Sequence, residues 1–174
     1  FNQALDKSTA EQIIENQFVE VIIAPGIDDG AIKALSAKEN IRLLNTKTLG
    51  TPDNSSKLLS VNGGLLIQQN DLAEILREDI KIVTERQPSN EEIENCLFAW
   101  KVCKFVKSNA IVYTKDNQTF GIGAGQMSRI DSAQIAASKA VERGFDTRGC
   151  CMASDAFFPF RDGLDAAAKI GITS

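Results

Sequence analysis

The chain has 174 residues, of which 43% are hydrophobic and 24% are charged, which is enough for one hydrophobic core or for two small ones. Its formal net charge of -4 argues against a general nucleic-acid or acidic-membrane partner, because basic surfaces bind those partners. No stretch approaches the roughly 18 apolar residues of a membrane span, and no signal pattern opens the chain. We therefore expect a cytoplasmic protein that binds neither nucleic acid nor a membrane.

The cysteine and histidine content argues against a metal centre. The four cysteines form no CxxC pair, and no histidine is present to complete a mixed zinc site. The adjacent Cys150 and Cys151 receive no role. Histidine is also the side chain whose ordinary pKa best suits proton transfer near neutral pH, so an enzyme made of these residues alone lacks the usual general base.

The first half of the chain predicts a strand, a helix and a strand, which is typical of a parallel sheet. Ser8 followed by Glu11 matches a capping box for a short helix over residues 9–18. The elements expected next are a buried strand, a helix and a second strand, over residues 19–25, 29–38 and 41–45. Residues 46–63 are rich in turn formers and predict a surface excursion, after which GLLIQQ resumes the sheet.

The second half of the chain repeats this alternation. Ser89 with Glu92 forms another capping box, and apolar residues then recur at helical spacing from Ile93 to Val106. Two extended runs within residues 109–125 predict a hairpin. The elements expected after it are a helix, a small-residue strand and a last helix, over residues 128–143, 149–157 and 162–171. The order of elements predicts an α/β fold.

The run GIGAGQMSR, residues 121–129, invites comparison with a dinucleotide-binding loop. The spacing does not fit, because GxGxxG requires a glycine at Gln126 or at Ser128. The alternative is a strand end whose glycines allow close packing. Ser128 is placed to cap the following helix, and Arg129 in the first helical turn is unfavourable for the helix dipole, so its position indicates a ligand.

Two other segments are candidates for a site. In VKSNAIVY, residues 106–113, Asn109 is either a turn residue that satisfies backbone groups or an amide that stabilises developing negative charge on oxygen. In SDAFFPFRDG, residues 154–163, three phenylalanines and a proline fit neither a core strand nor an amphipathic helix. An aromatic cluster bent by Pro159 suits a wall between two flat heterocycles.

Four separated segments together resemble one enzyme family: QFVEVIIAP, KSNAIVY, GIGAGQMSRIDSA and SDAFFPFRDG. They are similar to the formyltransferase part of the bifunctional purine-biosynthesis enzymes, AICAR transformylase/IMP cyclohydrolase. That family transfers a formyl group from 10-formyltetrahydrofolate to the nucleotide AICAR, aminoimidazole carboxamide ribonucleotide. The resemblance extends over essentially the whole chain and keeps the family's order of motifs.

The resemblance implies a three-layer αβα fold like cytidine deaminase, without its zinc, in which helices cover both faces of a mixed sheet. Residues 1–88 are then the end of a first such unit, and residues 89–174 are most of a second. A homodimer with active sites at the subunit interface is implied as well. The family's Lys-His pair lies upstream of the matched segments and its last folate loop lies downstream. We therefore expect a chain truncated at both ends that is inactive by itself.

The resemblance also assigns roles by position. The residues expected to contact AICAR are Glu20, Asn109, Arg129 and Phe157. Asn109 is the expected catalytic residue, donating a hydrogen bond to the formyl oxygen, and Ile130 and Asp162 are expected to bind the folate. For Phe158 and Phe160 a hydrophobic plug at a subunit interface is the alternative. A deaminase-like module that binds a nucleotide without chemistry and a purely structural dimerisation unit stay open as other functions.

Overall fold

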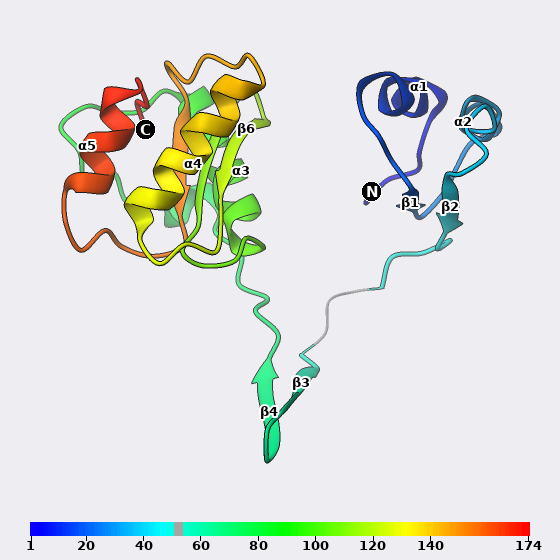
Figure 1. Ribbon diagram of the computed structural model, residues 1–174, viewed down its shortest axis with the longest axis horizontal. Coiled ribbons are helices and arrows are strands. Elements are labelled where there is room, and N and C mark those ends of the chain that lie inside the picture. The colour runs from blue at the N-terminus through cyan, green and yellow to red at the C-terminus, as the bar shows by residue number, and fades with distance from the viewer. Residues whose placement is uncertain (51–53) are drawn as a thin grey trace. The chain divides into compact units, whose positions relative to one another are not determined.

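The chain divides into two compact units, Phe1–Leu72 and Ala73–Ser174, in a computed structural model that describes residues 1–50 and 54–174 (Figure 1). Both units combine helices with strands, so the predicted α/β class is confirmed. None of the helices in the two described ranges is long and apolar enough to cross a membrane. The cytidine-deaminase-like architecture, and the division into 1–88 and 89–174 that accompanies it, stay predictions.

The first unit starts with two alternating helices and strands, α1 (Lys7–Asn16), β1 (Val21–Ala24), α2 (Asp29–Leu35) and β2 (Arg42–Asn45). β1 and β2 pair in parallel, with Val21 opposite Arg42. The strand, helix, strand prediction is therefore confirmed. Asp28 caps α2 by accepting a hydrogen bond from the backbone N–H of Ala31 at 2.6 Å.

The predicted capping box at the start of α1 is wrong. Asp6 is the cap, and its carboxylate accepts a hydrogen bond from the backbone N–H of Thr9 at 2.7 Å. A carboxylate also interacts favourably with the positive end of the helix dipole, so the helix begins directly after Asp6, at Lys7. Ser8 consequently lies inside the first turn and caps nothing.

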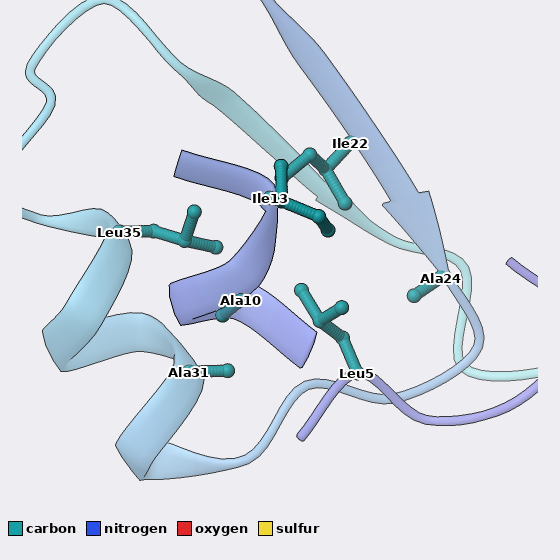
Figure 2. Close-up of a cluster of buried hydrophobic side chains, with 7 residues drawn as sticks. All are labelled: Leu5, Ala10, Ile13, Ile22, Ala24, Ala31 and Leu35. Atoms are coloured by element: carbon teal, nitrogen blue, oxygen red, sulfur yellow. The ribbon is translucent and has the colours of Figure 1, made fainter. Parts of the chain in front are cut away.

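The core of the first unit is formed where α1, α2 and β1 meet (Figure 2). Its buried side chains are Leu5, Ala10, Ile13, Ile22, Ala24, Ala31 and Leu35. Along β1, Ile22 and Ala24 point into this core while Val21 and Ile23 are exposed, because successive strand side chains alternate between faces. The strand predicted to be buried is therefore buried on one face only.

The segment GLLIQQ does not resume the first sheet, which corrects the prediction. It forms β4 (Gly64–Gln69), which pairs in antiparallel register with β3 (Ser56–Val61) as a separate two-stranded hairpin. Asn62 and Gly63 make the two-residue turn, and Gly63 adopts a positive φ of 81°. An Asn-Gly pair strongly favours such a local hairpin. Residues 51–53 of the predicted excursion lie outside the described residues.

The second unit is a three-stranded antiparallel sheet between helices, with strand order β6-β5-β7 (Figure 1). Its elements are the short 3-10 helix η1 (Arg77–Asp79), α3 (Asn90–Lys104), β5 (Ile111–Lys115), β6 (Gln118–Gly123), α4 (Arg129–Glu142), β7 (Cys151–Ser154) and α5 (Asp162–Lys169). Val112 faces α3, while Ile111 and Tyr113 face α4. Helices thus cover both faces of this sheet, although its described strand pairs are all antiparallel rather than mixed.

Local signals in the second unit agree with the sequence. Ser89 and Glu92 form the predicted capping box, in which each side chain accepts a hydrogen bond from the other residue's backbone N–H. Asp116 and Asn117, with φ values of 52° and 55°, form the turn of the predicted hairpin. Gly144 follows α4 with a φ of 77°, which confirms the predicted helix end.

Glu92 also holds the last residues of the chain against α3. Arg86 donates two hydrogen bonds to its carboxylate, both at 2.9 Å, and Thr173 donates a third at 3.0 Å. The hydrogen bonds from Arg86 are the main reason why the pKa of Glu92 is lowered to about 2. Arg86 in turn donates to the carbonyl oxygen of Thr173, so one ion pair joins three segments of the unit.

The glycines of residues 121–129 serve close packing. A Cβ atom added at Gly121 would lie 1.9 Å from the carbonyl oxygen of Ala136, and one at Gly123 would lie 1.9 Å from that of Ser132. The backbone of α4 therefore rests directly on β6, and any side chain at these two positions would push the helix away. The close-packing interpretation of these glycines is confirmed.

We predict that Gly123→Ala lowers the free energy of unfolding by about 3 kcal/mol, because α4 must move away from β6 to admit a methyl group. Urea unfolding of the whole chain followed by circular dichroism measures the change. Gln134→Ala, on the exposed side of α4, is the matched control and is expected to stay within about 0.5 kcal/mol of wild type. Equal stability of the two variants would contradict the close contact between Gly123 and the backbone of α4.

Candidate functional site

Three loop segments meet at one end of the three-stranded sheet. They precede β5, connect β6 to α4, and follow β7, since Ile111 at the start of β5 pairs with Gly123 and with Ser154 at the ends of the other two strands. Each segment contributes polar side chains, and hydrogen bonds join all three. This cluster contains two of the residues expected to contact AICAR, Asn109 and Arg129.

Asn109 is fixed by the loop that leads into α4. Its side-chain amide nitrogen and its backbone N–H both donate to the carbonyl oxygen of Gln126, at 2.9 and 3.1 Å. Its own carbonyl oxygen accepts a hydrogen bond of 2.7 Å from the buried hydroxyl of Ser132 in α4. The peptide bond between Ser108 and Asn109 is cis. The hydrogen bonds from Asn109 to Gln126 and from Ser132 to Asn109 therefore make the position of Asn109 depend on α4 and on the loop before it.

Arg129 is the first residue of α4 and turns toward the end of β7. Its Nε donates to the hydroxyl oxygen of Ser154 at 3.2 Å, and its Nη2 forms an ion pair of 3.2 Å with Asp155. The pair is largely withdrawn from solvent, since the two side chains are 17% and 13% exposed. An arginine at a helix N-terminus is disfavoured by the dipole, and Asp155 supplies the opposite charge that offsets this.

The carboxylate of Asp155 gathers donors from two segments. Besides Arg129, it accepts hydrogen bonds from the hydroxyl of Ser108 and from the backbone N–H of Ala110, the latter at 3.1 Å. Partial burial acts to raise the pKa of Asp155, but the hydrogen bonds from Ser108 and Ala110 and the charge of Arg129 outweigh it and lower that pKa. Asp155 is thus ionised at neutral pH.

The remaining predicted residues of this unit lie around the aromatic segment and the start of two helices. Ile130 follows Arg129 in α4 and is half-buried, and Asp162 opens α5, where its carboxylate accepts from the N–H of Gly163 at 2.8 Å. Phe157 is 80% exposed and offers its ring to solvent. No contact places Phe157 or Asp162 against Asn109, so their part in one site stays a prediction.

Comparison with known families identifies this chain. A family model described as the AICARFT/IMPCHase bienzyme matches residues 1–139. The chain belongs to this family. The resemblance drawn from the sequence segments is confirmed, and with it an enzyme family of purine biosynthesis. The matched range holds four of the predicted site residues, Glu20, Asn109, Arg129 and Ile130, whereas Phe157 and Asp162 lie after it.

The three phenylalanines of SDAFFPFRDG have different surroundings. Phe158 packs on the α4 side of the sheet together with Ile170, and its ring lies so close to Gly163 that an added Cβ would be 2.5 Å away. Phe157 and Phe160 are both largely exposed. Phe158 is therefore partly buried against the core of its own unit, and of the two exposed rings Phe157 is the one nearer in sequence to the cluster.

Glu20 belongs to the other compact unit. Its side chain is exposed, and its carbonyl oxygen accepts a hydrogen bond of 2.8 Å from the N–H of Arg42, the first residue of β2. Its participation in the AICAR site stays a prediction.

Within residues 1–50 and 54–174, no group of three or more His, Cys, Asp and Glu side chains is arranged to hold a metal ion.

Sequence reasoning missed the residue at the centre of the cluster, Asp155. The sequence does carry a signal for it, because Asp155 directly follows a strand of small residues, and an acidic side chain that is largely buried needs hydrogen-bond partners. Ser132 was missed as well, because a serine within a helix carries no mark of a tertiary contact. Both residues act through partners more than 20 positions away, which local patterns do not reveal.

We predict that Ser132→Ala destabilises the chain by about 1 to 2 kcal/mol, because the carbonyl oxygen of Asn109 loses its buried donor. Ser138→Ala is the matched control, since Ser138 lies on the same helix but is exposed. Urea unfolding of both variants gives the comparison. Equal unfolding curves for the two variants would show that α4 does not hold the Asn109 loop.

Proposed function

We propose that this chain contributes to a site that transfers a formyl group from 10-formyltetrahydrofolate to the amine of AICAR. The observation that supports the proposal is the cluster at the end of the sheet, where partly buried hydrogen bonds hold an amide, Asn109, and a guanidinium, Arg129. Both residues lie in the range matched by the AICARFT/IMPCHase family. The IMP cyclohydrolase activity of that family is assigned to no residue of this chain.

The proposed chemistry starts with attack of the AICAR amine on the formyl carbon. A C–N bond forms, negative charge develops on the formyl oxygen, and the bond between the formyl carbon and the folate nitrogen then breaks, releasing tetrahydrofolate. The amide of Asn109 donates one N–H to Gln126 and has a second N–H to donate to the developing charge. The amine must also lose a proton and the departing folate nitrogen must gain one, and since no histidine occurs among these residues we assign this proton transfer to none of them.

In this proposal, different residues bind the nucleotide and the folate. Arg129, with Glu20, contacts the nucleotide, because a guanidinium is suited to acceptor oxygens of a nucleotide. The exposed ring of Phe157 stacks on a flat heterocycle, and Ile130 and Asp162 contact the folate. The reaction transfers a formyl group between two organic substrates and calls for no metal ion. We place it in the cytoplasm, as predicted from the sequence.

The test of this proposal is tetrahydrofolate release by the full-length protein with both substrates present. We expect release to require AICAR, and we expect Asn109→Ala to lower kcat about 100- to 1,000-fold, because one donor to the developing charge is lost. Asn16→Ala, an exposed amide on α1, is the matched control and should leave kcat unchanged.

The outcomes separate the function from the residue. If well-folded wild-type protein shows no AICAR-dependent release, the formyltransferase proposal is wrong and nucleotide binding without chemistry takes its place. If release is normal in Asn109→Ala, the function stands and the role of Asn109 is wrong.

We also propose that the protein is a homodimer, and the hairpin β3–β4 supports this. Leu58, Leu65 and Ile67 line one face of the hairpin, and Leu59, Val61 and Leu66 line the other, all of them exposed. A two-stranded hairpin with apolar residues on both faces is unstable in water by itself and needs further surface to cover it. A symmetric dimer interface, in which each copy presents the same patch, supplies that surface.

We predict that Leu59→Lys combined with Leu66→Lys halves the molecular mass measured by light scattering, because charges on one face of the hairpin oppose its burial. Val141→Lys, at an exposed apolar position of α4, is the matched control and should stay dimeric. A monomeric wild-type protein would contradict the homodimer, and a double variant that stays dimeric would show that the hairpin is not its interface.

A further inference from the structure

Asp155 is the acidic residue at the centre of the cluster at the end of the sheet. The two carboxylate oxygens of Asp155 accept hydrogen bonds from Ser108 and Ala110 before β5 and from Arg129 at the start of α4. The N–H of Asp155 also donates to the carbonyl oxygen of Ala110 at 3.4 Å. Asn109 lies between the two β5-side partners in sequence. One residue therefore touches both neighbours of Asn109 and also the side chain of Arg129.

We propose that Asp155 is the positioning residue that orients both AICAR-contacting groups, Asn109 and Arg129, relative to each other; this inference rests on the proposed function. Asp155 holds the side-chain hydroxyl of Ser108 and the backbone N–H of Ala110, one on each side of Asn109, and it aligns the guanidinium through an ion pair. It touches no reacting atom itself.

The geometry at Arg129 supports this role. Ser154 and Asp155 hold Nε and Nη2, which lie along one edge of the guanidinium. Among the described residues, Nη1 donates no hydrogen bond, and it stays available to a ligand on the opposite side. Because the ion pair is largely withdrawn from solvent, Arg129 is held in one orientation rather than sampling many. A preoriented group binds its ligand at a lower entropic cost.

The geometry at Asn109 supports the same role. The two hydrogen bonds from Ser108 and Ala110 flank Asn109 and are charge-assisted, which makes them stronger than neutral ones. Loss of the carboxylate would free this loop at both neighbours of Asn109. A displacement of about 1 Å at a reacting group costs on the order of 100-fold in rate. Neither Ile130 nor Asp162 is hydrogen-bonded to Asp155, so the folate side should be unaffected.

The experiment compares Asp155→Ala, Asp155→Asn and Asp146→Ala in the full-length protein, with kcat and the two KM values measured separately. Asp146 is the matched control, since it also pairs with an arginine, Arg148, but at an exposed position. We expect Asp155→Ala to lower kcat about 100-fold and to raise the KM for AICAR, while the KM for 10-formyltetrahydrofolate stays constant. Asp155→Asn keeps the shape and loses the charge, and we expect a loss of about 10-fold in kcat.

The outcomes distinguish positioning from stability. A merely structural role would reduce the active fraction, lowering kcat without changing the KM for AICAR. That pattern, or kinetics of Asp155→Asn equal to those of Asp146→Ala, would overturn the inference. If Asp155→Ala does not fold, the kcat and the KM for AICAR of Asp155→Asn decide between positioning and stability.

A crystal structure of Asp155→Asn adds a readout that does not depend on turnover. We expect Arg129 to leave its position beside Ser154, and an unmoved Arg129 and Asn109 would overturn the inference. If the wild-type protein shows no AICAR-dependent turnover, the proposed function fails, and this structure still decides whether Asp155 orients the two groups.

Discussion

The close contact between α4 and β6 sets the geometry of the whole second unit. Gly121 and Gly123 let the helix backbone rest on the strand, at a distance that leaves no room for a side chain. At that distance Ser132 reaches the carbonyl oxygen of Asn109, and Arg129 reaches Asp155 beyond the end of β7. The glycines therefore contribute to the candidate site indirectly: they fix the helix that carries Arg129, and the polar cluster forms around its N-terminus.

Much of the fold could be predicted where local chemistry decides it. The capping box of Ser89 and Glu92, and the turn at Asp116 and Asn117, are made by residues close in sequence, and both appear as expected. The predictions were wrong where another local signal determined the structure. Asp6 capped α1 ahead of the predicted box, and the Asn-Gly turn before Gly64 made a separate hairpin of a segment that was expected to extend the sheet.

The candidate site could be predicted in part. Asn109 and Arg129 were identified through resemblance to a family, and the structure places both in one hydrogen-bonded cluster, although their roles stay proposals. The residue that joins them, Asp155, was missed because its partners come from two other loops that only the folded sheet brings to its end. Functional groups carry recognisable motifs, whereas the residues that hold them depend on tertiary contacts.

The most direct test of the central claim is a crystal structure of the full-length protein with AICAR bound. The account predicts that the nucleotide lies against the cluster, within hydrogen-bonding distance of the Asn109 amide and of the Nη1 of Arg129, with Asp155 still paired to the guanidinium. A nucleotide bound elsewhere, with the hydrogen bonds of Asn109 and Arg129 unchanged, would contradict the account and leave the cluster with a structural role alone.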